Sequence, residues 1–198
     1  SSDSHLGRLH ALWTLEGLGR LDPEFLYETL SDADPNVRAS AATLYRRYLA
    51  MESMVSTIVR DLSEIADDEN KLVRMQIVLA LGLIDSTSAE QVIEPTLRAA
   101  ADDEQLLTGI LSGFAGKETE FLTARLSQPN WKSPEPWRRK LLGQAAGVMW
   151  RQRDPVAILR FCYLLDAIPE EQSWQTVALL EGIKDPPRPL RRRRFPPP

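Results

Sequence analysis

The 198-residue sequence has 43% hydrophobic and 26% charged residues, a composition typical of a folded chain and not of a disordered one. Its single cysteine excludes an internal disulfide framework, a four-thiolate zinc site and a CxxCH haem attachment within these residues. The longest stretch without charge, Gln105 to Gly116, is far shorter than the roughly 18 apolar residues of a membrane-spanning helix. We therefore expect neither a membrane span nor an export signal in this sequence.

Charge is distributed unevenly along the chain. The whole sequence carries a net charge of −4, but its last segment, DPPRPLRRRRFPPP, holds five arginines and one aspartate. Without that segment, 19 basic and 27 acidic residues remain, which gives the preceding body a net charge of −8. Six of the 14 prolines lie in the same segment and favour extended backbone. We predict a folded domain over residues 1–184 and an extended tail over 185–198.

Apolar residues recur at the spacing of helices that bury one face. In LVRMQIVLALGLI, from Leu72 to Ile84, they follow the i, i+3, i+4, i+7 pattern, and almost no segment alternates as a strand would. Acidic and proline-containing breaks such as DADPN, from Asp32 to Asn36, recur at short intervals. Because Asp and Ser cap helix N-termini and Pro suits the first turn, these breaks predict helix starts.

The helices form a repeat. Six of them align at matching positions separated by 30, 36, 33, 32 and 35 residues, namely Arg8, Arg38, Arg74, Leu107, Arg139 and Trp174. A second helix is predicted in each interval, over Pro23 to Leu30, Ser53 to Ile65, Ala89 to Ala101, Glu118 to Leu126 and Asp154 to Ile168. Since one helix pair cannot bury its own apolar face, we expect an all-α, right-handed α-solenoid of about five and a half helix pairs.

Two segments resemble HEAT repeats. DPNVRASA, from Asp34 to Ala41, and ENKLVRMQIVLALG, from Glu69 to Gly82, each combine an acidic turn, a Val-Arg pair and small residues in the first helix. The resemblance implies HEAT-like helix pairs over roughly residues 5–184. It also implies a non-catalytic scaffold that binds other proteins or links neighbouring domains.

A narrower resemblance is carried by RLHALWTLEGLGRLDPEFL, from Arg8 to Leu26. This segment resembles the HEAT segment of large bacterial proteins, common in planctomycetes, in which a sorbosone-dehydrogenase-like propeller precedes it and a c-type cytochrome domain follows. The resemblance implies a periplasmic or extracytoplasmic module, or a subunit, of a redox complex. Neither a propeller nor a haem motif is present in these residues, so no cofactor is assigned to them.

Few residues offer catalytic or metal-binding chemistry. His5 and His10 would point about 140° apart on one helix and could not share a metal ion. Cys162 lies in an apolar helix, AILRFCYLLDAI, and is expected to be a buried, inert thiol. The acid pairs that include Asp68 and Asp103 lie at predicted turns, where capping explains them. We expect no catalytic residue, cofactor or metal, and no enzymatic activity.

The proline-rich loop QPNWKSPEPW is the largest irregularity in the repeat. Its tryptophans, Trp131 and Trp137, are candidate partner contacts, because irregular loops and large aromatics are frequent in interfaces. The alternative is that they cover the core, where Trp13 and Trp174 are also expected. A basic cluster follows the loop and could bind phosphate or an acidic partner, or could be the solvated part of one helix. It comprises Arg138, Arg139, Lys140, Arg151 and Arg153.

The second helices are expected to supply the partner-binding surface. Arg60 and Arg98 are candidate contacts there, among eight charged residues that comprise Glu28, Arg60, Asp61, Glu64, Glu94, Arg98, Arg125 and Arg160. In the tail, Arg191, Arg192, Arg193 and Arg194 repel one another and could contact an acidic protein groove, a nucleic acid or anionic lipid. One alternative is a subunit of a membrane-associated redox assembly anchored by this tail. Another is a HEAT-like enzyme of DNA-glycosylase type, which the acidic body opposes because it would repel DNA.

Overall fold

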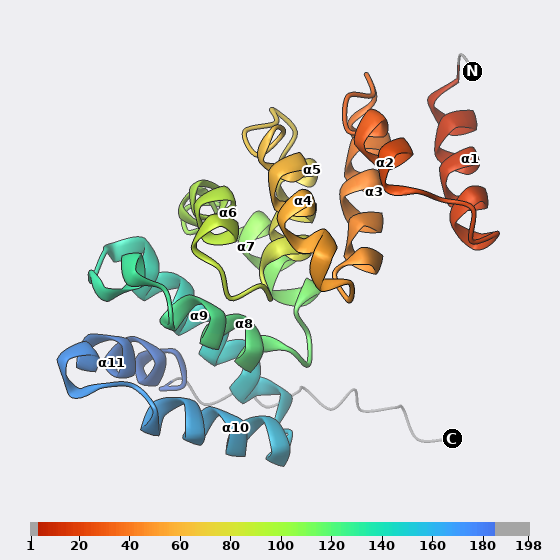
Figure 1. The fold of residues 1–198 in the computed structure, drawn as a ribbon. Helices are drawn as coiled ribbons and strands as arrows, with labels where there is room; N and C mark the ends of the chain where they lie inside the picture. Colours follow the sequence, from red (N-terminus) through yellow and green to blue (C-terminus); the bar gives the residue numbers. More distant parts are fainter. Residues whose placement is uncertain (1–3, 185–198) are drawn as a thin grey trace, which may run out of the picture.

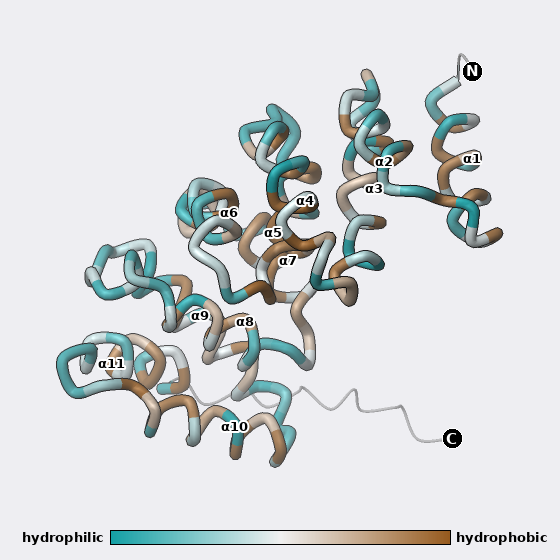
Figure 2. Tube along the Cα trace, in the orientation of Figure 1, coloured by the Kyte–Doolittle hydropathy of each residue, from teal (hydrophilic) through white to brown (hydrophobic). Residues whose placement is uncertain are grey.

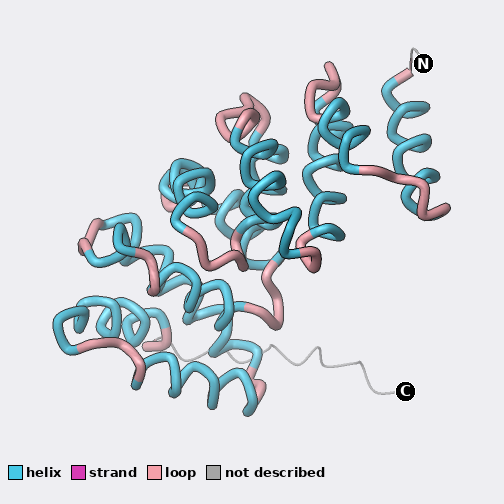
Figure 3. Tube along the Cα trace, viewed as in Figure 1, coloured by secondary structure: helices cyan, strands magenta, loops and turns pink. Residues whose placement is uncertain are grey.

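The computed structural model describes residues 4–184, and this part of the chain is helical without a strand (Figure 3). Three short 3-10 helices, η1 (Arg46–Tyr48), η2 (Pro129–Lys132) and η3 (Glu170–Gln172), lie between the α-helices. The α-helices are α1 (His5–Gly17), α2 (Pro23–Thr29), α3 (Pro35–Tyr45), α4 (Glu52–Ser63), α5 (Lys71–Leu81), α6 (Thr87–Ala100), α7 (Glu104–Gly113), α8 (Glu118–Leu126), α9 (Pro136–Gln152), α10 (Pro155–Asp166) and α11 (Ser173–Gly182).

The helices stack in chain order along an arc, from α1 at one end to α11 at the other (Figure 1). The first helices of successive units, α1, α3, α5, α7, α9 and α11, pack on one another in sequence. Among the second helices, α4 packs on α6 and α8 packs on α10. The prediction of an α-solenoid built from five and a half helix pairs is therefore confirmed for the described residues.

Side-chain caps begin many of these helices where the sequence breaks predict them. The Asp34 carboxylate accepts a hydrogen bond from the N–H of Asn36, and the Asp103 carboxylate accepts one from Leu106. Caps of this kind contribute about 1 kcal/mol each to helix stability. The same role is played by Asp22, Asn70 and Asp154.

The apolar core runs from one end of the arc to the other, and hydrophobic segments recur on every helix (Figure 2). In its middle, the Phe114 and Phe121 rings stack with centroids 4.4 Å apart. Two expectations about the core are wrong. Trp13 is 43% exposed, because no described unit packs on the outer side of α1. Cys162 is also exposed, because α10 turns Phe161 and Leu164 toward the core and Cys162 away from it.

Arginine–aspartate pairs join successive units near the starts of the first helices. Arg8 Nε lies 2.6 Å from Asp32 Oδ2, and Arg38 Nε lies 2.7 Å from Asp68 Oδ2. Asp32 lies two residues before the N-cap residue of α3, and Asp68 lies two residues before the N-cap residue of α5. Ala101 occupies the corresponding position before α7, so this type of pair is not repeated there.

Helices α9 and α11 approach most closely at glycines. A Cβ atom on Gly182 would lie 1.8 Å from the carbonyl oxygen of Gly143, and one on Gly147 would lie 2.9 Å from the carbonyl oxygen of Gly182. Gly143 and Gly147 are four residues apart and therefore lie on one face of α9. The GQAAG sequence, from Gly143 to Gly147, thus determines how closely α9 and α11 pack.

Candidate functional site

The second-helix surface contains a hollow between α4 and α6. It has a volume of about 370 Å³ and combines apolar side chains with hydroxyl, amide and guanidinium groups. Two successive units contribute to it, so stacking alone creates this concave surface. The hollow is lined by Val59, Arg60, Ser63, Ala66, Ser88, Gln91 and Val92.

Arg60 is exposed beside this hollow and remains a candidate contact. Its Nη2 atom lies 2.8 Å from Asp61 Oδ1. Asp61 was expected to be exposed, but it is buried and accepts a hydrogen bond of 2.9 Å from the Tyr45 hydroxyl. Burial and this hydrogen bond raise the pKa of Tyr45. The arginine therefore faces solvent, whereas its aspartate partner belongs to the core.

The predicted role of Trp131 as a partner contact is wrong, because its side chain is completely buried. Its indole Nε1 donates a hydrogen bond of 2.6 Å to Glu90 Oε1, and its ring meets that of Trp137 edge-on at 5.3 Å. Trp137 is also buried, and its Nε1 donates to Glu135 Oε2. Both tryptophans therefore anchor the proline-rich loop to the core, which is the alternative that the sequence left open. Trp174, expected in the core, is partly buried beside it.

The predicted role of Arg138 as a partner contact is also wrong, because its side chain is buried. Its guanidinium lies 3.3 Å from Glu94 and 3.0 Å from Glu135, and it stands over the Trp137 ring at 4.9 Å. Arg98 contacts the same two carboxylates and the same ring, but its side chain is 54% exposed. Of the two arginines, only Arg98 can reach a partner while keeping these contacts.

Arg125 was expected on the second-helix surface, but it is fully buried. Its Nε lies 2.5 Å from Glu90 Oε2, and its Nη1 donates a hydrogen bond of 2.7 Å to the carbonyl oxygen of Gly82. Burial lowers the pKa of Arg125, and the Glu90 carboxylate opposes that shift. This pair joins α8 to the end of α5 and to α6, so it is structural.

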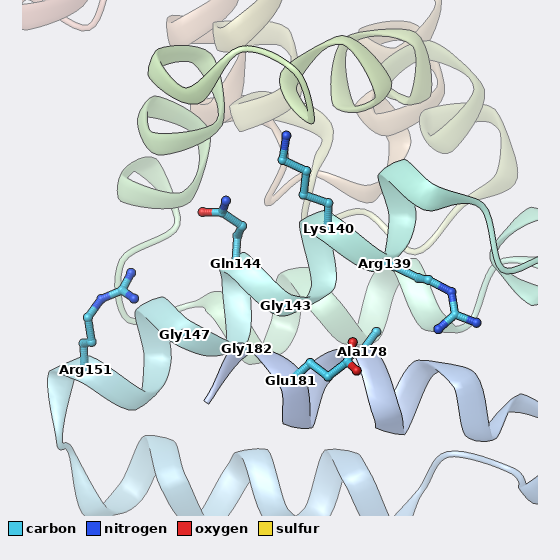
Figure 4. A pocket seen from close by; sticks show the side chains of 9 residues that line it. All are labelled: Arg139, Lys140, Gly143, Gln144, Gly147, Arg151, Ala178, Glu181 and Gly182. Atoms are coloured by element: carbon cyan, nitrogen blue, oxygen red, sulfur yellow. The ribbon is translucent and has the colours of Figure 1, made fainter. Parts of the chain in front are cut away.

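Arg139 lies on the opposite, first-helix layer, in a second hollow between α9 and α11 (Figure 4). This hollow, which we call the basic groove, has a volume of about 370 Å³. The structure thus places Arg139 apart from Arg60 and Arg98. The groove is lined by Arg139, Lys140, Gly143, Gln144, Gly147, Arg151, Ala178, Glu181 and Gly182.

The remaining sequence-based candidates add no further site. Arg191, Arg192, Arg193 and Arg194 lie outside the described residues. Within residues 4–184, no three His, Cys, Asp or Glu side chains come together as metal ligands. No helix in the same part of the chain combines the length and apolarity required to cross a membrane.

Residues 23–108 match the family model described as HEAT repeats. This part of the chain, residues 23–108, is therefore similar to HEAT repeats. The matched segment begins with α2 and ends within α7, and stacked repeats of this kind typically present surfaces that bind other proteins. No curated protein and no solved structure matches the chain. The match supports the general HEAT resemblance over residues 23–108. The narrower resemblance to dehydrogenase and cytochrome proteins stays a prediction.

Proposed function

We propose that this HEAT-repeat protein is a non-catalytic scaffold that binds a protein partner on its second-helix surface. The observation that carries the proposal is the hollow between α4 and α6, which two successive repeats form together. Arg60 on α4 lines the hollow, and Arg98 is exposed further along α6. These positions suit a partner that contacts several units at once.

The fixed geometry of the repeat supports such binding. Side chains at the surface are held by contacts with neighbouring units, as when the Tyr27 hydroxyl donates a hydrogen bond of 3.0 Å to Glu64 Oε2. Arg98 is held similarly against Glu94 and Glu135. A surface that is ordered before binding loses less conformational entropy on association, so modest contacts add up to useful affinity.

A face-specific comparison tests this proposal. The variant Arg60→Ala, Glu64→Ala, Arg98→Ala removes three charges from the second-helix surface. The control Arg20→Ala, Arg46→Ala, Glu104→Ala makes the same change in net charge at exposed positions elsewhere. Both variants should keep the wild-type circular dichroism spectrum. Partners recovered with the wild-type chain from its native source are quantified by mass spectrometry for each variant.

We expect the second-helix variant to recover at least about tenfold less of a specific partner, as three lost contacts of moderate strength imply. The control should recover the partner at nearly the wild-type level. Equal recovery by both variants would show that the partner binds elsewhere.

We further propose that this scaffold is a module or subunit of an extracytoplasmic redox protein. The segment that bears the narrower resemblance begins within α1, a helix on which Leu6 and Trp13 are 54% and 43% exposed. These apolar side chains are available to pack against a neighbouring domain. Purification from the native source together with a haem-containing or dehydrogenase-like protein would support this assignment. Recovery of partners from another compartment and without redox cofactors would contradict it.

A further inference from the structure

The basic groove lies between two first helices, away from the hollow on the second-helix surface. Lys140, Gln144 and Arg151 extend from the side of α9 that is turned away from α11, Arg139 extends in another direction, and Glu181 lies on α11 (Figure 4). Its lining therefore holds three cationic side chains and one carboxylate. This local excess of positive charge stands on a chain whose body carries a net charge of −8.

Glycines give the groove its backbone floor. Gly143 and Gly147 face Gly182 so closely that a Cβ on Gly182 would lie 1.8 Å from the Gly143 carbonyl oxygen. No side chain rises from these three positions into the space above them. Arg151 folds back over this floor, since its Nη1 lies 3.2 Å from the position that a Cβ on Gly147 would take.

Two of the three cations have no carboxylate partner within the described residues. The Arg139 guanidinium lies 5.4 Å above the Trp174 ring, and the indole Nε1 of Trp174 is fixed by a hydrogen bond of 3.2 Å to the carbonyl oxygen of Lys132. The Arg151 guanidinium forms no ion pair with residues 4–184. Lys140 lies 3.7 Å from Asp102, in a pair that is exposed to solvent. The guanidinium donors of Arg139 and Arg151 are thus available to a ligand.

The spacing of the cations defines the length of that ligand. Lys140 is seven residues from Gly147, over which the Arg151 side chain folds, and seven residues rise about 10 Å along a helix axis. About three residues of extended peptide span the same distance. Carboxylates two or three residues apart on an extended peptide could therefore meet both cations.

We propose that the basic groove binds an acidic peptide segment of a partner protein, with glutamates or aspartates two or three residues apart. This inference rests on the proposed scaffold function and identifies the chemistry of one of its docking sites. A peptide fits the observations better than a nucleic acid does, because the groove is short and the surrounding body is acidic. A long polyanion would meet repulsion beyond the groove.

Fluorescence anisotropy with the full chain and a labelled GSGEGEGSG peptide tests the proposal. Lys140→Gln, Arg151→Gln removes two cations from the groove, and Arg20→Gln, Arg46→Gln is the control with the same change in net charge at exposed positions outside it. Glu181→Gln removes the carboxylate of the groove. All variants keep the tail arginines, so any contribution of the tail is common to them.

We expect Lys140→Gln, Arg151→Gln to weaken peptide binding by about fivefold to tenfold, and the control to change it by less than about twofold. Glu181→Gln should tighten binding by about twofold, and a GSGQGQGSG peptide should not bind. Equal weakening by both double variants, or equal binding of the glutamine peptide, would overturn the proposal. Displacement of the labelled peptide by inorganic phosphate at equal concentration would also overturn it. Absence of peptide binding would remove the groove as a docking site without affecting the scaffold proposal, which is tested by partner recovery.

Discussion

The buried Glu90–Arg125 pair joins α6 to α8 in the middle of the solenoid. Arg125→Met should destabilise the protein by about 3–5 kcal/mol, because it leaves the Glu90 carboxylate buried without its cation. It also leaves the Gly82 carbonyl oxygen without this donor. Urea unfolding followed by circular dichroism measures the loss.

An exposed ion pair provides the control. Arg160 lies 3.2 Å from Glu120, and both side chains are about half exposed. Arg160→Met should therefore cost less than about 1 kcal/mol. If Arg125→Met and Arg160→Met lowered the free energy of unfolding equally, the buried ion pair would stabilise the fold no more than an exposed one does.

The Arg38–Asp68 pair makes stability depend on acid pH. Burial raises the pKa of Asp68, but hydrogen bonds from Arg38 and from the N–H of Asn70 lower it overall. A carboxylate with a lowered folded-state pKa stabilises the protein above its unfolded pKa of about 3.9, and this stabilisation is lost as pH falls through the folded-state value.

Arg38→Gln should therefore lower the free energy of unfolding more at pH 7 than at an acid pH below the folded-state pKa of Asp68, where this carboxyl group is protonated in both states. Urea unfolding across this pH range measures the difference between variant and wild type. A difference that stays constant with pH would mean that the ion pair does not stabilise the fold.

For single residues, the sequence predicts the positions that recur in the repeat better than it predicts the burial of individual charged or aromatic side chains. Arg38 is located by the repeat, because its position recurs at the start of each first helix. Arg125 and Glu90 lie in amphipathic helices, where a charged residue is normally solvated, so nothing in the local pattern indicates their burial. The burial of Trp131 is not predictable for a similar reason, since a proline-rich loop normally lies at the surface, whereas this one folds back onto α6.

At the level of elements, the close approach of α9 and α11 makes Gly182 sensitive to substitution. Gly182→Ala should destabilise the protein by about 2–4 kcal/mol, because the new Cβ would meet the Gly143 backbone and force the two helices apart. Thermal and urea unfolding measure this effect.

Gly17→Ala is the matched control at the end of α1. A Cβ at Gly17 meets no atom within 4 Å, and the residue does not have a positive φ. Alanine should therefore be neutral or stabilise the helix by up to about 1 kcal/mol. A similar loss in both variants would indicate that helix packing at Gly182 is not the cause.

Helix positions follow closely from the sequence because capping signals mark many of their starts. Asp34 and Asp154 cap α3 and α10, where the acidic breaks predict helix starts. The η2 helix over Pro129–Lys132 was not predicted, because it is short and is held by contacts distant in sequence. Among these contacts is the hydrogen bond of 2.9 Å from Gln175 Nε2 to the carbonyl oxygen of Trp131.

At the scale of the whole molecule, stacking creates the two hollows that we propose as docking surfaces. The hollow between α4 and α6 and the basic groove between α9 and α11 each combine residues of two successive units. The period and the amphipathic pattern predict the solenoid. They do not predict the basic groove, because its shape depends on contacts between Gly143 and Gly182, which are far apart in sequence.

In a stack of repeats, each helix pair depends mainly on its neighbours along the arc. Hydrogen exchange with mass spectrometry on Gly182→Ala tests this claim most directly, since the substitution perturbs only the last interface. We predict faster exchange in α9 and α11 and nearly unchanged exchange in α3 and α5. An equal acceleration in all four helices would contradict the account, because it would show a single globular unit and not a stack of repeats.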